Sequence, residues 1–363
     1  MIRIDELYNN TFWPWLRQHR PGFRALACDP FGRSDPDSVI GYGREDVHEH
    51  NYIFFFDQEP IHLNYHMATF DEIVRRNKDI NGAQGAIVTS ERDSDNVDAL
   101  CKKYGWKNYY YFFHGWAALD WYRGYDKTFL IKPWELRQPS KTFIAPNRII
   151  AGERRHRLEM LYWMFKLGMT DNHISCPTVC PAEDISIYDA TKTLPYQDAA
   201  EVFQSVSLPM QYAGETDHPM HSCWLSLFDE SADSLLYLVT ETVATGRRHH
   251  ITEKTFKPIA MGMPFVLVAT AGSLEYLRSY GFKTFGHVWD ESYDTIQDPH
   301  QRIRAVAGLL KDLCGLSPAE RVTLFHDAIP TIEHNWNHFY GGGFEAVLWD
   351  ELQGMLNRVK SGL

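Results

Sequence analysis

The sequence of 363 residues lacks any apolar run long enough to span a membrane. Its first residues, MIRIDELYNN, lack the basic-then-apolar order of a signal peptide. It has only six cysteines, which are scattered along the chain and form no disulfide framework. We therefore expect a cytoplasmic protein (host cytoplasm if the source is a virus) with free thiols and no membrane partner.

Positive charge is also scarce, since 36 Lys and Arg residues face 47 Asp and Glu residues and the net charge is −11. A protein that coats nucleic acid normally carries a basic face, so this balance argues against that class. We find no counterpart of the Asp-x-Asp motif of metal-dependent transferases and expect no essential metal. Two histidine groups have metal-like spacing, but we interpret them as surface or packed side chains: His218, His221 and Cys223, and His334 with His338.

What the chain does have is enough residues for two domains. In the first half, short apolar runs alternate with a helical pattern. The expected strands are residues 23–28, 52–56, 85–89 and 108–113, and the expected helix is 95–104. Polar residues follow each strand, as in doubly wound sheets, where ligands bind at the carboxyl ends of the strands.

A second alternating unit begins near residue 141. Its expected strands are 141–145, 235–240 and 264–269, and its expected helices begin near 154, 252, 273, 299 and 318, the last of these ending near 326. Residues 170–230 show no clear pattern, and 341–343 (GGG) are expected to be a flexible linker. We expect an α/β protein with domains at 1–140 and 141–340 facing a cleft, and a C-terminal helix within 341–363 that crosses back.

The segment 241–265, ETVATGRRHHITEKTFKPIAMGMPF, carries the strongest chemical signal. A strand ends in Glu241, a basic turn includes Arg247, and a helix opens with Thr252, Glu253 and Lys254. Helix N-termini bind phosphate through main-chain N–H groups and a partial positive charge, and a lysine there adds a further charge. The alternative is a solvated basic turn before an ordinary capped helix.

A second basic cluster, APNRIIAGERRHR, lies at another helix start. Positive charge is unfavourable at a helix N-terminus, which indicates an anionic ligand. Arginine binds phosphate with two parallel hydrogen bonds. Arg157 is our first candidate for such a contact and Arg154 the second, and the alternative is a solvated helix end.

The turn Asp57-Gln58-Glu59-Pro60 follows the second expected strand and offers a general base. An acceptor hydroxyl needs such a base to remove its proton. We assign this role to Glu59, with Asp57 as the alternative. A carboxylate in this position is equally typical of a residue that caps the next helix.

The 241–265 segment resembles the donor-binding motif of the α1,3-fucosyltransferase family. There a strand ends in Glu, a glycine-containing turn follows, and Thr-Glu-Lys opens a helix before a Pro-headed strand. The second half is also similar to glycosyltransferase-like proteins of large bacteriophages. The residues that match the fucosyltransferase motif are Glu241, Gly246, Thr252-Glu253-Lys254 and Pro264. The residues that match the phage proteins are ITEKTFKPI, positions within 274–285, and 290–294.

The resemblance implies a GT-B-type fold of two Rossmann-like domains and an inverting, metal-independent glycosyltransferase. It implies that Glu253 contacts the donor ribose, Lys254 the diphosphate, and Glu241 the sugar. Thr240 and Thr242 depart from the family, which has an aromatic residue before the Glu and Asn after it, and this puts fucose in doubt.

The expected donor is a UDP- or GDP-sugar with no further cofactor. The acceptor is a glycan, a protein or a hydroxymethylated pyrimidine in phage DNA. The rival hypothesis is a catalytically inactive module that binds nucleotide sugars. The sequence does not indicate an oligomeric state.

Overall fold

The computed structural model describes most of the chain as a mixed α/β protein with two mainly parallel sheets. The described residues are 4–20, 23–28, 39–42, 51–76, 85–123, 134–180, 184–211 and 224–362. The chain forms two compact units. Unit 1 comprises Met1–Asp120, Gly246–His250 and Glu345–Leu363, and unit 2 comprises Trp121–Thr245 and Ile251–Phe344.

The sheet of unit 1 has the strand order β2-β1-β3-β4-β5, with only β2 antiparallel to its neighbour. Its strands are β1 (Phe23–Cys28), β2 (Val39–Tyr42), β3 (Asn51–Phe56), β4 (Ala86–Thr89) and β5 (Lys107–Tyr110). The strands expected at 23–28, 52–56 and 85–89 are confirmed, because continuous apolar runs such as IFFF suit a sheet covered on both faces. The strand expected at 108–113 is too long, since α5 (Phe113–Arg123) already begins at Phe113.

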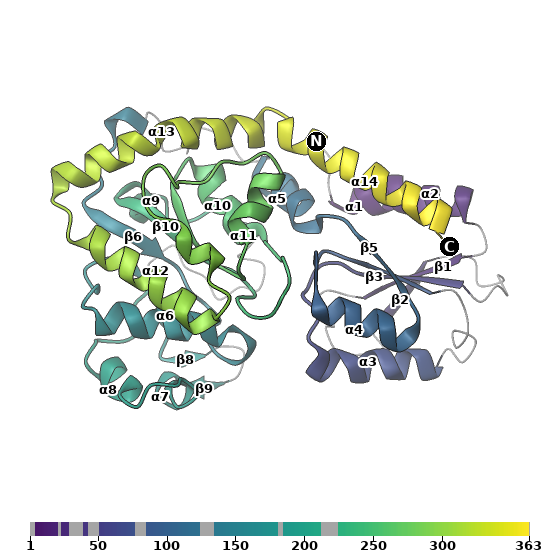
Figure 1. Ribbon diagram of the computed structural model, residues 1–363, viewed down its shortest axis with the longest axis horizontal. Helices are drawn as coiled ribbons and strands as arrows, with labels where there is room; N and C mark the ends of the chain where they lie inside the picture. The colour runs from purple at the N-terminus through teal and green to yellow at the C-terminus, as the bar shows by residue number, and fades with distance from the viewer. Residues whose placement is uncertain are drawn as a thin grey trace. The chain divides into compact units, whose positions relative to one another are not determined.

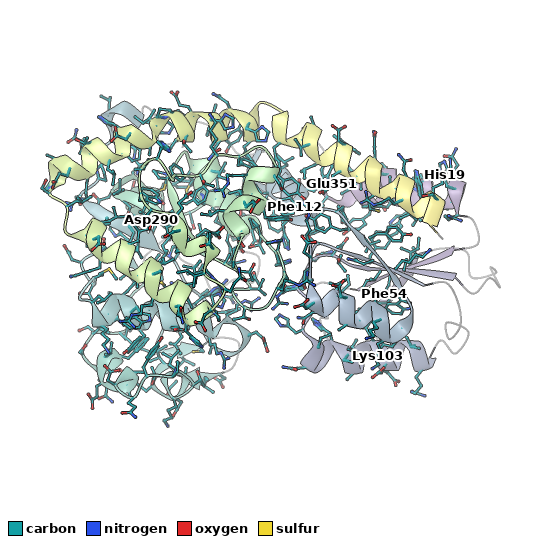
Figure 2. All side chains as sticks on the ribbon, in the orientation of Figure 1. His19, Phe54, Lys103, Phe112, Asp290 and Glu351 are labelled. Atoms are coloured by element: carbon teal, nitrogen blue, oxygen red, sulfur yellow. The ribbon has the colours of Figure 1, made fainter. Side chains whose placement is uncertain are left out.

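Two helices, α3 (Leu63–Arg76) and α4 (Asp95–Tyr104), enclose one apolar core against this sheet. The core includes Phe54, Phe70, Ile87, Leu100 and Trp106, and Figure 2 labels Phe54 within it. The expected helix 95–104 is confirmed. Ser94 caps its first turn, and a left-handed glycine, Gly105, ends it.

The other face of the sheet packs against both ends of the chain. The N-terminal part forms α1 (Ile4–Leu7), the π-helix η1 (Tyr8–Phe12) and α2 (Trp13–His19). Phe12 stands edge-on to Phe55, with ring centroids 5.2 Å apart. From α14 (Gly343–Gly362), Glu351 accepts a hydrogen bond from the main-chain N–H of Phe112 at 2.8 Å, and both residues are labelled in Figure 2. The last helix thus belongs to unit 1 by its contacts.

The sheet of unit 2 is parallel throughout, with the order β11-β10-β6-β7. Its strands are β6 (Lys141–Ala145), β7 (His173–Ile174), β10 (Ser234–Thr240) and β11 (Phe265–Val268). Its longer helices are α6 (Arg155–Lys166), α10 (Glu253–Met261), α11 (Ser273–Ser279), α12 (Pro299–Cys314) and α13 (Pro318–Tyr340). Helices α6 and α12 cover one face of this sheet and α10 and α13 the other (Figure 1).

The remaining elements of unit 2 are short and lie mainly in the region where the sequence shows no pattern. They are η5 (Trp134–Leu136), η6 (Gly152–Arg154), β8 (Val179–Cys180), β9 (Ile185–Ser186), α7 (Ile187–Thr191), α8 (Ala199–Gln204), α9 (Phe228–Ala232) and η8 (Ser292–Thr295). In the part of the chain that the structure describes, no helix combines the length and apolar character needed to cross a membrane.

Helix α13 corrects the sequence analysis. We expected it to end near His326, yet it continues to Tyr340 with Pro330 inside it. Proline removes one main-chain hydrogen bond from a helix, but the buried side chains of Phe325, Ile332 and Phe339 keep the helix packed along its length. The expected GGG linker is correspondingly short, because α14 begins at Gly343.

Candidate functional site

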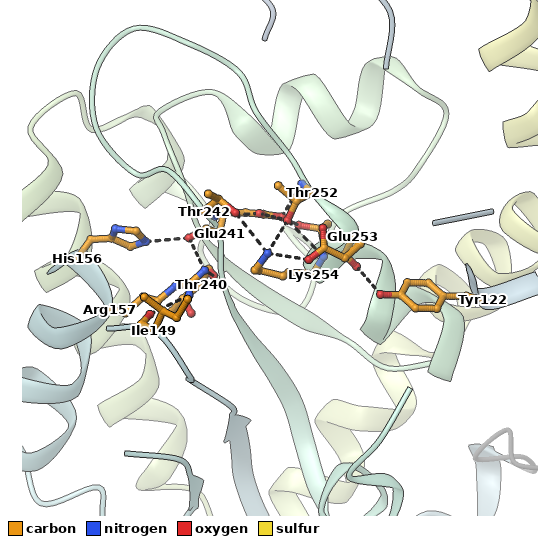
Figure 3. A network of polar contacts seen from close by, with 11 residues as sticks. Tyr122, Ile149, His156, Arg157, Thr240, Glu241, Thr242, Thr252, Glu253 and Lys254 are labelled. Carbon is orange, nitrogen blue, oxygen red and sulfur yellow. Dashed lines mark hydrogen bonds and ion pairs between the residues drawn. The ribbon is translucent and has the colours of Figure 1, made fainter. Parts of the chain in front are cut away.

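The candidate site of unit 2 lies where β10 ends and α10 begins (Figure 3). Every residue of β10 is buried, and Glu241 follows directly at its carboxyl end. Thr252 then caps α10, with its side chain accepting from the N–H of Lys254 at 3.4 Å. The junction of a parallel strand and the next helix is a common ligand-binding position in α/β sheets.

The carboxylate of Glu241 is completely buried and accepts four hydrogen bonds from the protein. Its Oε1 accepts from the N–H of Thr252 at 3.0 Å and from the hydroxyl of Thr255 at 2.6 Å. Its Oε2 accepts from the hydroxyl of Thr252 at 2.6 Å and from the N–H of Thr242 at 3.1 Å. These contacts fix the Glu241 side chain against the first turn of α10, a position where acidic groups are favourable.

Lys254 is the cation of this junction, and its side chain is 30% exposed. Its ammonium group donates to Glu253 Oε1 at 2.7 Å, to the Thr252 hydroxyl at 3.2 Å and to the Thr242 hydroxyl at 3.3 Å. Glu253 itself is nearly buried, with a side chain 6% exposed. The site therefore pairs a hydrogen-bond donor of positive charge with an adjacent carboxylate acceptor.

Arg157 and His156, from the first turn of α6, support the end of β10 from the buried side. Arg157 donates to the carbonyl oxygens of Thr240 and Glu241, each at 3.1 Å, and to that of Ile149 at 2.9 Å. His156 Nε2 donates to the Glu241 carbonyl oxygen at 2.9 Å, since that oxygen can only accept. Burial lowers the pKa of His156 to about 3 and that of Arg157 to about 9.

The structure thus gives Arg157 three main-chain partners, which the sequence analysis did not foresee. Arg157 is 5% exposed, whereas Arg154, the second candidate for a phosphate contact, is half-buried at the N-cap of the same helix. Arg247, the third candidate arginine, belongs to unit 1 by its contacts. Its exposed side chain pairs with Asp95 at 2.5 Å and with Asp98 at 3.2 Å.

The candidate base residues of unit 1 have different surroundings. Asp57 follows β3 directly, is 3% exposed, and accepts from the hydroxyls of Tyr8 at 2.7 Å and Tyr111 at 2.5 Å. Burial raises the pKa of Asp57 to about 6, although both hydrogen bonds act in the opposite direction. Glu59 lies two residues further on and is half-buried.

A third carboxylate near a strand end, Glu91, is not among the candidate residues of the sequence analysis. It lies just beyond β4, is 1% exposed, and accepts from the Ser94 hydroxyl at 2.6 Å and from the N–H of Ile61. Arg248 Nη1 lies 3.7 Å from it. Burial raises the pKa of Glu91, with the Arg248 charge opposing that rise. Its place two residues after a strand, close to the strand-end positions of Asp57 and Glu241, was the signal available in the sequence.

One statement of the sequence analysis about metals needs correction. Asp93, Ser94 and Asp95 do have Asp-x-Asp spacing, but Asp95 is paired with Arg247 and Asp93 lies 3.8 Å from Arg92. Among the residues that the structure describes, no three His, Cys, Asp or Glu side chains come together as a metal site. His218, His221 and Cys223 lie outside the described residues.

Comparison with known proteins adds no relative: no family model, no curated protein and no solved structure matches this chain.

Proposed function

We propose that this protein is a glycosyltransferase of the two-domain GT-B type that moves a sugar from a nucleotide-sugar donor to an acceptor hydroxyl. Unit 2 would bind the donor and unit 1 the acceptor. The observation that carries the proposal is the pairing of Lys254 with Glu253 in the first turn of α10. A ligand anion would bind Lys254 in place of the Glu253 carboxylate. A ligand hydroxyl would donate to Glu253 in place of the Lys254 ammonium group.

A nucleotide sugar offers both groups at once. Its diphosphate is an anion suited to a helix N-terminus that carries a lysine. Its ribose hydroxyls can donate to Glu253 after Lys254 turns toward the phosphates. The threonine hydroxyls of Thr242 and Thr252 already accept from Lys254, at 3.3 Å and 3.2 Å, and keep the ammonium group over the helix start. A UDP- or GDP-sugar is the donor class that this chemistry favours.

In the same proposal, transfer proceeds by one displacement with inversion at the anomeric carbon and without a metal. Glu59 is the proposed base, since it is half-buried and follows a strand end of unit 1. Asp57 is the alternative, because a carboxylate with a pKa of about 6 is ionised at neutral pH and still basic enough to take a proton. The proposed acceptors are a glycan, a protein or a hydroxymethylated pyrimidine in DNA.

A second function is favoured by a specific observation. Glu241 and Asp57, two of the three acids assigned to catalysis, are buried and bonded to protein groups. A catalytically inactive module that binds nucleotide sugars would retain such structural carboxylates and the Lys254 pair. Sugar transfer and donor hydrolysis, measured with a panel of nucleotide sugars and acceptors, separate the two functions.

The test of donor binding is Lys254→Ala. Loss of a charge-assisted contact costs about 1.5–3 kcal/mol, which corresponds to roughly ten- to a hundredfold weaker donor binding. Calorimetry with the best nucleotide sugar of the panel measures this loss. The matched control is Lys166→Ala, which removes an ion pair with Asp198 elsewhere on unit 2 and should leave donor affinity unchanged. Equal donor affinity in wild type and Lys254→Ala would refute the assignment.

A further inference from the structure

The connection between β10 and α10 leaves unit 2 and returns to it. Residues Gly246–His250 belong to unit 1, whereas Thr245 and Ile251 on either side belong to unit 2. Gly246 opens this excursion with a φ of +81°, a left-handed conformation that favours glycine. We call Gly246–His250 the crossing segment.

Main-chain hydrogen bonds fix the crossing segment to the start of α4 in unit 1. Arg92 and His249 form an antiparallel bridge, with N–H to O distances of 3.0 Å and 2.8 Å. The N–H of Asp95, in the first turn of α4, donates to the carbonyl oxygen of Arg247 at 3.0 Å. A short segment held in this way is an ordered part of unit 1 rather than a solvated basic turn.

Arg248 is the buried centre of the segment, at 6% exposure, and its carboxylate partner is Glu91. Arg248 Nη1 also donates to the carbonyl oxygen of Ile61 at 2.9 Å, while Glu91 accepts from the N–H of the same residue. Ile61 is therefore held on both sides of its main chain. It lies two residues after Glu59, so the Arg248–Glu91 pair fixes the loop that carries the proposed base.

The ends of the connection are fixed in unit 2. Before the segment, Arg302 of α12 donates to the carbonyl oxygen of Ala244. After it, the buried Ile251 leads directly to Thr252, which Glu241 holds through two hydrogen bonds. Only three residues separate Arg248 from Thr252, the N-cap of α10. The chain between Arg248 and the N-cap of α10 is thus short and is held at both of its ends.

We propose that Arg248 is a positioning residue that joins the Glu59 loop of unit 1 to the first turn of α10. The proposal deepens, and rests on, the glycosyltransferase function proposed above. Arg248 contacts neither donor nor acceptor. It acts through Ile61 on the base and through the crossing segment on the phosphate site, so that both elements that must cooperate in transfer depend on one buried ion pair.

Two kinds of variant test this role. The first is Arg248→Lys, which keeps the charge but cannot reproduce the planar guanidinium group, together with Arg248→Met/Glu91→Gln, which leaves no unpaired buried charge. The second is Asp95→Asn/Asp98→Asn, which removes the exposed pairing of Arg247 without entering the core. The control is Lys103→Met/Asp71→Asn, an exposed ion pair of unit 1, 2.6 Å long, remote from the crossing segment in sequence.

The expected result for the Arg248 variants is a kcat lowered about ten- to a hundredfold. Donor affinity changes less, because Glu241 still holds Thr252. Hydrogen exchange without any ligand should rise together at the amides of residues 61–63 and 252–255. The Asp95/Asp98 variant should show the same pattern more weakly, and the control variant neither change.

Each outcome decides a separate question. A variant with a lower Tm but wild-type kcat and unchanged exchange at residues 252–255 would reduce Arg248 to a purely structural role. Faster exchange at only one of the two segments would also overturn the proposal. If the wild type transfers no sugar and binds no donor, the proposed function fails, and the exchange measurement still decides whether Arg248 couples the two segments.

Discussion

The burial of Asp57 makes the free energy of unfolding depend on pH in a defined direction. Desolvation raises the pKa of this carboxyl from 3.8 to about 6 in the folded protein. Between those two values the folded state binds a proton that the unfolded state releases, so acid stabilises the fold and a rise in pH removes that stabilisation. At about 1.4 kcal/mol for each pKa unit, the ionised side chain costs the folded protein about 3 kcal/mol above about pH 6.

Asp57→Asn removes the ionisation and keeps the shape of the side chain. Urea unfolding of wild type and variant, at about pH 4 and about pH 7.5, isolates the effect of this one group. The free energy of unfolding of the variant, relative to wild type, should rise by about 2 kcal/mol between the two conditions, because the unfolded-state carboxyl is already partly ionised at about pH 4. Asp71→Asn is the control, since the Lys103 hydrogen bond lowers the pKa of that exposed carboxyl and gives the opposite sign.

A pH-independent difference between wild type and Asp57→Asn would refute the reasoning. It would mean that the hydrogen bonds from Tyr8 and Tyr111 compensate the cost of burial in full. Tyr8→Phe separates the effect of burial from that of the hydrogen bonds, because removal of one donor should raise the pKa of Asp57 further. The apparent pKa can be followed directly by the carboxyl carbon resonance of Asp57 in an NMR titration.

Two further predictions concern the remaining candidate residues. Arg157→Lys should lower the free energy of unfolding by about 2–4 kcal/mol in urea titrations. The reason is that a lysine cannot reach all three carbonyl oxygens and leaves buried acceptors unpaired. A loss of donor affinity at unchanged stability would instead support the predicted phosphate contact. Glu59→Gln should lower the rate of sugar transfer about 10²- to 10⁴-fold while the donor-dependent rise in Tm persists; near-normal turnover would exclude Glu59 as the base and direct the test to Asp57→Asn.

The fold was largely predictable where local sequence carries the physical cause. A buried parallel strand reads as a continuous apolar run, as in residues 52–56 and 235–240. The sequence also indicates both ends of helix α4, because Ser94 is a typical N-cap and Gly105 follows the last helical residue. The predicted end of helix α13, near residue 326, was too early. A proline such as Pro330 locally indicates a helix break, whereas packing along the helix decides its length.

The candidate site was less predictable, because the partners of its charged residues are distant in sequence. Arg157 reads as a phosphate ligand, but its acceptors are main-chain oxygens, and two of these belong to residues more than 80 positions away. The turn that contains Arg247 and Arg248 is interpreted from the sequence as a solvated basic turn or, through Arg247, as a donor contact. Their carboxylate partners lie on the segment that runs from Glu91 to Asp98, about 150 positions earlier. No local sequence pattern predicts such pairings.

The three strand-end carboxylates show that a position typical of catalytic acids can also be taken by acids with a structural role. Asp57 and Glu241 follow a parallel strand directly, and Glu91 lies two residues after one, at the place where catalytic acids are expected in α/β proteins. That place is also where the chain turns and exposes N–H groups that lack partners in the sheet or the next helix. Glu91 and Glu241 accept from those N–H groups and from nearby hydroxyls, and Asp57 accepts from two tyrosines.

These three acids therefore share one physical task, which is to order the loops and helix starts at the carboxyl ends of the strands. Next to two of these acids the chain places a less buried candidate residue: Glu59 two residues after Asp57, and Lys254, which lies with Thr252 and Thr255 around the carboxylate of Glu241. In each case a buried acid fixes a loop beside a less buried candidate residue. Substitution of Glu241 should lower the free energy of unfolding, because four donors lose their acceptor, whereas substitution of Glu59 or Lys254 should leave it nearly unchanged and lower the proposed activity.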